Sequence, residues 1–113
     1  LLPGARDPRL SAALTLMSQN LDDPLDLARV AGAQGIGLRR LEQLFREGLG
    51  QGPGAAYLEL RLQAARRMMA DTAHPIQEIA LRCGFADRSS FSRAFRRRFG
   101  QAPRALRVGK AVG

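Results

Sequence analysis

Residues 79–100 read IALRCGFADRSSFSRAFRRRFG, in which a short apolar stretch, a glycine and a longer basic stretch follow one another. Phenylalanine recurs at every fourth position of the basic stretch, so a helix there would have one apolar and one charged face. The inward side chains are predicted to be Ile76, Ile79, Ala80, Phe91, Ala94, Phe95 and Phe99. Gly84 is placed to form a tight turn and Asp87 to cap the second helix. This order is a helix-turn-helix pattern.

The chain carries the pattern twice. The sequence VAGAQGI at residues 30–36 precedes IALRCGF by 49 positions, and FREGLGQGP at 45–53 precedes FRRRFGQAP at 95–103 by 50 positions. In the earlier copy Asp26 and Gly37 are placed to cap the two helices and Gly35 to form the turn. The inward side chains are predicted to be Leu27, Val30, Ala31, Leu41, Leu44, Phe45 and Leu49. Two copies of one small helical unit predict two similar contacts a fixed distance apart, for which duplex DNA is the obvious target.

Two more helices are predicted from apolar spacing. Leu10, Leu14 and Met17 recur at helical intervals within residues 7–20, and Pro53 is suited to begin a helix that continues to about residue 72. The inward stripe of that second helix is predicted to be Leu58, Leu62, Ala65 and Met69.

The predicted fold class is therefore all-α, with about seven helices and two helix-turn-helix modules joined by a long linker helix. We expect residues 1–6 to be a linker from a missing N-terminal region and residues 7–52 to be the first module. Residues 53–73 are expected to form the linker helix, and residues 74–113 the second module with a basic tail.

Positive charge is concentrated in the second copy. The chain has a net charge of +8; residues 1–81 hold nine arginines and nine acidic residues, whereas residues 82–113 hold nine basic residues and only Asp87 as an acid. The planar arginine fork suits phosphate and guanine better than lysine does. A GC-rich coding sequence would also favour arginine over lysine, but it does not explain the clustering.

Several other classes of protein are disfavoured. No apolar run approaches the ~18 residues that a membrane span needs, and no signal segment opens the sequence. Cys83 is the only cysteine, which excludes an internal disulfide and fits a reducing cytosol, and His74 is the only histidine. The glycines of residues 48–54 do not follow a G-x-G-x-x-G spacing. We therefore expect no enzyme, no metal and no cofactor, and no membrane association.

Three stretches of the sequence resemble a known family of proteins. The C-terminal stretch 79–100 followed by Pro103 is similar to the signature of the AraC/XylS family of bacterial transcription regulators. RLQAARRMM at residues 61–69 resembles that family's linker helix, and LEQLF at 41–45 its first recognition helix. The resemblance covers roughly residues 8–108 and implies two recognition helices in adjacent major grooves of DNA, usually downstream of a separate sensor domain.

The sequence departs from the family pattern at two helix starts. The family usually places serine or threonine at the cap of the first recognition helix, where this chain has Gly37, and serine where it has Pro75. Glycine caps a helix less well than serine by a few tenths of a kcal/mol. The departures bear on local rigidity more than on the fold.

A helical wheel of each recognition helix separates outward from inward side chains. With the apolar residues facing inward, the outward and flanking positions predicted to read bases are Arg39, Arg40, Gln43, Arg46, Ser89, Ser92, Arg93 and Arg96. The family's base-reading positions match these. Arginine pairs with guanine and glutamine with adenine, whereas serine is permissive. A solvated charged face is the alternative for any single residue of this set. Glu42 and Glu47 flank the outward residues of the first recognition helix.

Phosphate contacts are predicted for a second group: Arg97, Arg98, Arg104 and Arg107. Arg98 falls on the inner side of the wheel and is equally expected to lie over the edge of the core. The backbone N–H groups at the helix starts near Leu38 and Arg88 are further candidates.

The predicted function is sequence-specific binding of double-stranded DNA by a bacterial transcription regulator located in the cytoplasm with the nucleoid. RNA polymerase is a further partner that the resemblance implies, and this part of the chain is expected to be monomeric. Two alternatives remain open: a non-specific basic nucleic-acid binder and a helical protein-interaction adaptor.

Overall fold

The computed structural model describes residues 7–112, with side chains to Arg107, and the linker predicted for residues 1–6 lies outside this range. The described residues form seven α-helices and no strand. They are α1 (Pro8–Ser18), α2 (Leu27–Ala33), α3 (Leu38–Leu49), α4 (Pro53–Asp71), α5 (Ile76–Arg82), α6 (Arg88–Phe99) and α7 (Pro103–Val112). The all-α prediction is confirmed. The chain divides into two compact units, one ending at Leu60 and one beginning at Arg61, within α4.

The first unit packs α1, α2 and α3 with the beginning of α4 around one core. Asp26 caps α2 as predicted, because its carboxylate accepts from the backbone N–H of Ala28. Asp7 caps α1 in the same way through the N–H of Arg9, a cap that was not predicted from the sequence. The buried side chains that form this core cluster are Leu10, Ala13, Met17, Val30, Ala31, Leu41, Phe45, Ala56 and Tyr57. Each helix of this unit therefore contributes one apolar face to a shared interior.

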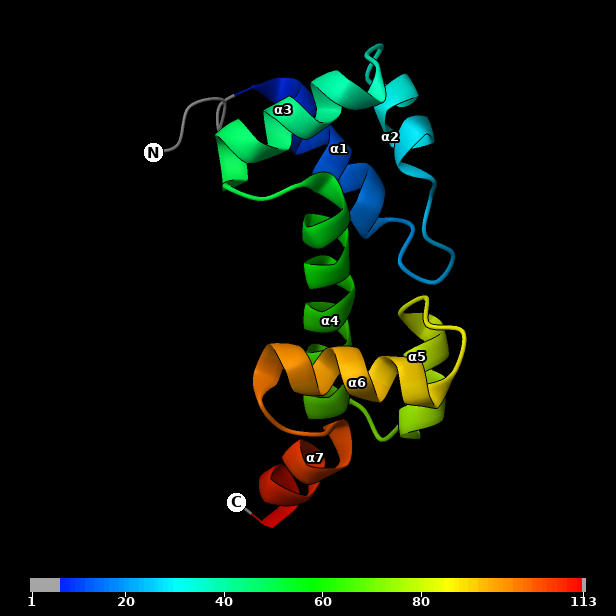
Figure 1. Cartoon of the computed structure of the whole chain (residues 1–113). Coiled ribbons are helices and arrows are strands. Elements are labelled where there is room, and N and C mark those ends of the chain that lie inside the picture. Colours follow the sequence, from blue (N-terminus) through cyan, green and yellow to red (C-terminus); the bar gives the residue numbers. More distant parts are fainter. Residues whose placement is uncertain (1–6, 113) are drawn as a thin grey trace. The chain divides into compact units, whose positions relative to one another are not determined.

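The sequence repeat is also a structural repeat. Figure 1 shows the same pair of a short and a longer helix in α2 and α3 as in α5 and α6. Gly35 and Gly84 both adopt the left-handed backbone conformation, with φ of 71° and 83°, which favours glycine. In each turn the backbone N–H of the residue after the glycine donates to the carbonyl five positions earlier. Ile36 donates to Ala31 at 3.2 Å, and Phe85 donates to the equivalent Ala80 at 3.0 Å.

The second unit has an aromatic core. The rings of Phe85, Phe91, Phe95 and Phe99 form a ladder with successive centroid separations of 5.2, 5.5 and 4.6 Å. Leu62, Ala65 and Met69 of α4 are buried as predicted. Cys83 is buried as well, and burial raises the pKa of its thiol although Arg61 and Arg67 oppose that shift. A buried neutral thiol fits a small core residue better than a nucleophile.

Two predicted inward side chains lie at the surface instead. Leu49 is 37% exposed at the last residue of α3, and Leu58 is 36% exposed on α4. The wheel placed Leu58 in line with Leu62, but the buried residues of this part of α4 are Ala56 and Tyr57. The period of a helix defines a stripe, whereas the neighbouring elements decide which part of it is covered.

The helix that follows each helix-turn-helix pair holds the loop that precedes the pair. In the first unit Tyr57 of α4 donates its hydroxyl hydrogen to the Asn20 carbonyl and accepts from the Leu25 N–H. In the second unit Arg107 of α7, 50 positions later, donates to the carbonyls of His74 and Thr72. The repeat thus preserves the position of this tie while its chemistry changes from a phenol to a guanidinium.

Candidate nucleic-acid interface

The polar face of α3 carries the predicted base-reading residues of the first unit. Arg39, Gln43 and Arg46 are exposed because Leu41, Leu44 and Phe45 occupy the opposite, buried face. Arg40 is half-buried, and its charge contributes to lowering the pKa of Asp7, so it lies toward the start of α1. The main cause of that low pKa, about 2, is the hydrogen bond from the Arg9 side chain.

Two of the exposed side chains of α3 have defined neighbours. The Gln43 amide nitrogen donates to Oε1 of Glu47 at 3.0 Å, one turn along the helix. The Arg46 guanidinium lies over Gly52, where an added Cβ would be 3.4 Å from Nη2. Glu47 was predicted only to flank the outward residues, although the spacing of four residues from Gln43 could have indicated the pair.

The polar face of α6 is more basic. Ser89, Arg93 and Arg96 are exposed and Ser92 is half-buried, because Phe91 and Phe95 turn the opposite face into the core. Arg97 and Arg98 are exposed beside them. The Arg98 guanidinium lies 4.8 Å from the centroid of the Phe99 ring, so it covers the edge of the aromatic core while remaining at the surface.

The N-termini of the two recognition helices differ. Asp87 caps α6 by accepting from the Ser90 N–H at 2.7 Å. Backbone hydrogen bonding from Ser90 is the main cause that lowers the Asp87 pKa, and the charge of Arg93 lowers it further. Gly37 caps α3 without any side chain. The backbone N–H groups near Arg88 thus face a carboxylate of the chain itself, which disfavours the phosphate contact expected there.

The four predicted phosphate-binding arginines are placed differently. Arg97, Arg98 and Arg104 are exposed, Arg104 in the first turn of α7. Arg107 is half-buried, and its guanidinium is engaged by the carbonyls of His74 and Thr72. The structure gives Arg107 a role inside the second unit that its charge alone did not indicate.

Sequence reasoning missed Arg61. Its Nε and Nη2 donate to the carbonyl oxygens of Cys83 and Gly84, both at 2.8 Å, and its guanidinium lies 4.3 Å from the centroid of the Phe85 ring. This side chain therefore holds the turn from which α6 begins. Apart from the resemblance of residues 61–69 to a linker helix, the sequence carries no signal for this contact, which joins residues 22 and 23 positions apart.

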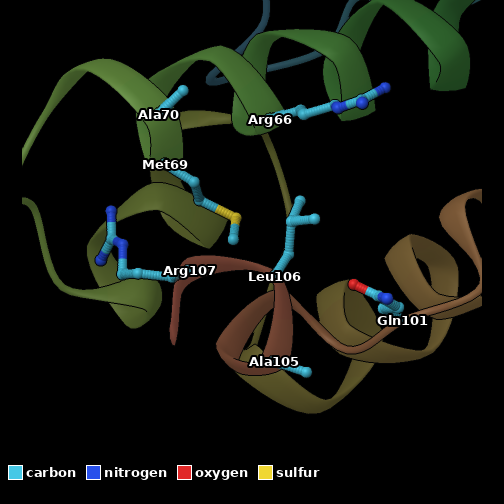
Figure 2. A pocket seen from close by; sticks show the side chains of 7 residues that line it. All are labelled: Arg66, Met69, Ala70, Gln101, Ala105, Leu106 and Arg107. Atoms are coloured by element: carbon cyan, nitrogen blue, oxygen red, sulfur yellow. The ribbon is translucent and has the colours of Figure 1, made fainter. Parts of the chain in front are cut away.

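One pocket lies away from the polar face of α6. It has a volume of about 370 Å³ and is lined by Arg66, Met69, Ala70, Gln101, Ala105, Leu106 and Arg107. Figure 2 shows the Met69 and Leu106 side chains extending into the space between α4 and α7, with Arg66 and Arg107 at its margins. Its lining supplies apolar, amide and guanidinium groups.

The part of the chain that the structure describes holds neither a metal-binding cluster nor a membrane-spanning helix. Within it, no three His, Cys, Asp or Glu side chains gather closely enough to hold a metal ion. None of the helices in residues 7–112 combines the length and the apolar character needed to cross a bilayer.

Comparison with known proteins gives matches across most of the chain. A family model described as a helix-turn-helix domain matches residues 27–108. The HTH-type transcriptional regulator GbdR of Pseudomonas aeruginosa is 38% identical over 110 residues, which make up 97% of this chain and 30% of that protein. The chain thus spans about a third of the length of the curated relatives it matches.

Two solved structures are similar over nearly their whole length. A transcriptional regulator from Chromobacterium violaceum, described as containing an AraC-type DNA-binding domain, superposes with a TM-score of 0.88 at 39% identity, covering 92% of this chain and 93% of that one. The DNA-binding domain of the global transcriptional factor AdpA, solved with a target DNA, gives 0.83 at 25% identity, covering 88% and 90%.

Proposed function

We propose, because this chain belongs to the AraC/XylS family of helix-turn-helix transcription regulators, that it recognises a specific sequence of double-stranded DNA. One observation carries the proposal: two matched helix-turn-helix pairs each expose a polar face of the second helix while burying its apolar face. Such a helix fits the major groove, where its side chains can reach the base edges.

Two recognition helices favour a target that offers two grooves. Successive major grooves on one side of B-DNA lie about 34 Å apart. At 1.5 Å per residue, the 19 residues of α4 make a helix of about 28 Å. A helix of that length between the two pairs supports contacts to adjacent grooves, with some bending of the DNA where the spacings differ.

The exposed side chains divide by role. Arg39, Gln43 and Arg46 of α3, and Ser89, Arg93 and Arg96 of α6, read bases, with Arg40 and Ser92 at the flanks. Arg97, Arg98 and Arg104 bind phosphate. Arg107 contributes mainly by holding α7 to the loop before α5.

Selection of bound sites from a random duplex pool, followed by hydroxyl-radical footprinting of the selected site, tests the proposal. We expect one preferred sequence and two protected major-groove segments about 10 base pairs apart. Inserting five base pairs between the half-sites should abolish the paired protection, because it rotates one groove to the opposite side of the duplex. Protection of a single groove, or of both after the insertion, contradicts the two-groove model.

The same experiment separates the rival functions. A non-specific basic nucleic-acid binder would have nearly equal affinities for the selected duplex and for random duplex. A helical protein-interaction adaptor would show no salt-dependent DNA binding at all. Membership of a family of helix-turn-helix transcription regulators favours specific binding over both.

The second unit is expected to supply most of the salt dependence. Affinity for any duplex rises with the number of phosphates neutralised, and α6 carries five arginines while the acids Glu42 and Glu47 accompany those of α3. The double variant Arg96→Ala/Arg97→Ala should therefore flatten the plot of log affinity against log salt more than Arg39→Ala/Arg46→Ala does. Each pair removes two positive charges, so the two variants are matched controls. A greater flattening from the first-unit pair would refute this assignment.

Binding of double-stranded DNA implies a role in the regulation of transcription. A regulator of this family acts in the bacterial cytoplasm on chromosomal DNA, by binding and not by catalysis, and contact with RNA polymerase is the expected route from binding to transcription. We expect the described part to bind DNA as a monomer, because a single chain already contains two recognition helices, α3 and α6.

A further inference from the structure

The hydrogen bond between Gln43 and Glu47 has a consequence for which bases α3 selects. Gln43 is exposed on the polar face, and its Nε2 donates to Glu47 Oε1 at 3.0 Å. A glutamine amide has one acceptor oxygen and two donor hydrogens on its nitrogen. One hydrogen is engaged by Glu47, which leaves the other hydrogen and the Oε1 atom for an outside partner.

The partner fixes which way round the amide lies. An ionised carboxylate accepts hydrogen bonds and donates none. Turning the Gln43 amide over would place its oxygen against the Glu47 oxygens, where two acceptors repel. The amide nitrogen is therefore held on the side of Glu47, toward the C-terminal end of α3, and the amide oxygen on the other side.

We infer that Glu47 is a specificity-determining positioning residue, which orients the Gln43 amide so that it distinguishes an A·T from a T·A base pair. The inference rests on the proposed function. Adenine presents an N6–H donor and an N7 acceptor in the major groove, and glutamine pairs with both. An amide held in one orientation matches adenine on one strand, whereas an amide free to turn can follow adenine to either strand.

The second recognition helix has no glutamine–glutamate pair at the equivalent positions. Arg93 and Arg97 stand 50 positions after Gln43 and Glu47. Two guanidiniums are both donors and cannot hydrogen bond with each other. The structural repeat therefore combines one recognition helix with an oriented neutral side chain and one with charged side chains at the same positions.

Two variants separate orientation from charge. Glu47→Ala and Glu42→Ala each remove one negative charge from the surface of α3, but only Glu47→Ala removes the acceptor of Gln43. Alanine is a good helix former, so α3 should persist in both, which circular dichroism checks. Charge removal alone would raise the affinity for every duplex equally.

The measurement is the base preference of each variant by selection from a random duplex pool, followed by affinities for duplexes differing at one base pair. Gln43→Ala first identifies the base pair that Gln43 reads, as the position where preference is lost. There the parent chain should favour A·T in one orientation by roughly 5- to 150-fold. Glu42→Ala should keep this ratio, whereas Glu47→Ala should reduce the A·T to T·A ratio to within about threefold of one. Glu47→Ala should have no effect on that ratio in a Gln43→Ala background.

The other outcomes overturn the inference. Full preference in Glu47→Ala would mean that Gln43 needs no partner, and loss of preference in both variants would assign the effect to charge. A Gln43→Ala chain with an unchanged selected site would remove the base-reading residue itself. A parent chain that selects no site at all would refute the proposed function, which is a different result from a specific site that ignores residue 47.

Discussion

Replacing Phe91 with alanine is expected to lower the free energy of unfolding of the second unit by about 3 to 5 kcal/mol. Phe91 is fully buried, and its ring stands between those of Phe85 and Phe95 at 5.2 and 5.5 Å. Removing the ring costs its burial and leaves a cavity beside two aromatic neighbours. A unit of this size has a total stability of only about 3 to 8 kcal/mol, so a large part of the population should be unfolded.

Amide NMR spectra of the whole chain, recorded during chemical denaturation, measure this effect for each unit separately. Signals of the second unit should lose their dispersion in Phe91→Ala, whereas those of the first unit should keep theirs. Leu81→Ala is the control, because Leu81 is 53% exposed on α5 and its removal should change stability by less than about 0.5 kcal/mol. Equal stability of the two variants would show that the aromatic ladder is not the main core of this unit.

Replacing Arg61 with alanine is the second large effect, an expected loss of about 2 to 4 kcal/mol from the same unit. Hydrogen bonds from a charged donor contribute about 1.5 to 3 kcal/mol each, and Arg61 makes two to the turn that precedes α6. Because Arg61 is only half-buried, solvent screening reduces their sum. Its contact with the Phe85 ring adds to these. Because the same turn sets the direction of α6, affinity for DNA should fall with stability.

Thermal denaturation and duplex affinity of three variants separate the causes. Arg61→Lys keeps the charge but lacks the planar fork that reaches two carbonyls, so it should recover only part of the loss. Arg66→Ala is the matched control on the same helix, because the contact that the structure shows for its guanidinium is with the Phe99 ring at 5.0 Å. It should cost about 0.5 to 1 kcal/mol. Equal stability of Arg61→Ala and Arg66→Ala would show that the two hydrogen bonds from Arg61 to the turn do not stabilise the second unit.

Much of the fold follows from interactions between residues close in sequence. The repeated turn glycine and helix phenylalanine, together with the N-caps Asp26 and Asp87, predict both helix-turn-helix pairs, since a turn glycine, an N-cap and a helical stripe each act within a few residues. Pro53 marks the start of α4 correctly for the same reason. The outward positions of α3 and α6 are likewise exposed as the wheel predicts, and their roles toward DNA remain predictions.

The interface was harder to predict where one side chain controls another. The wheel places Gln43 and Glu47 on the polar face, but it treats Glu47 as a flanking charge and does not assign it a partner. It places Arg98 on the inner side, and of the two positions left open for this residue the structure shows the one over the edge of the core, exposed against the Phe99 ring. A long side chain can bend away from the direction of its Cα–Cβ bond. The helical wheel, which gives only that direction, therefore does not locate the charged end of the side chain.

By itself, the sequence determined the helices, their turns and caps, and which faces carry charge, because these depend on local spacing and on the conformations that each residue type allows. Only the tertiary structure decided that Arg61 holds the turn before α6, that Arg107 binds the loop before α5, and that Leu49 and Leu58 stay at the surface. Those outcomes depend on contacts between residues far apart in the chain. A local period carries no information on which distant carbonyl or apolar surface will lie within reach.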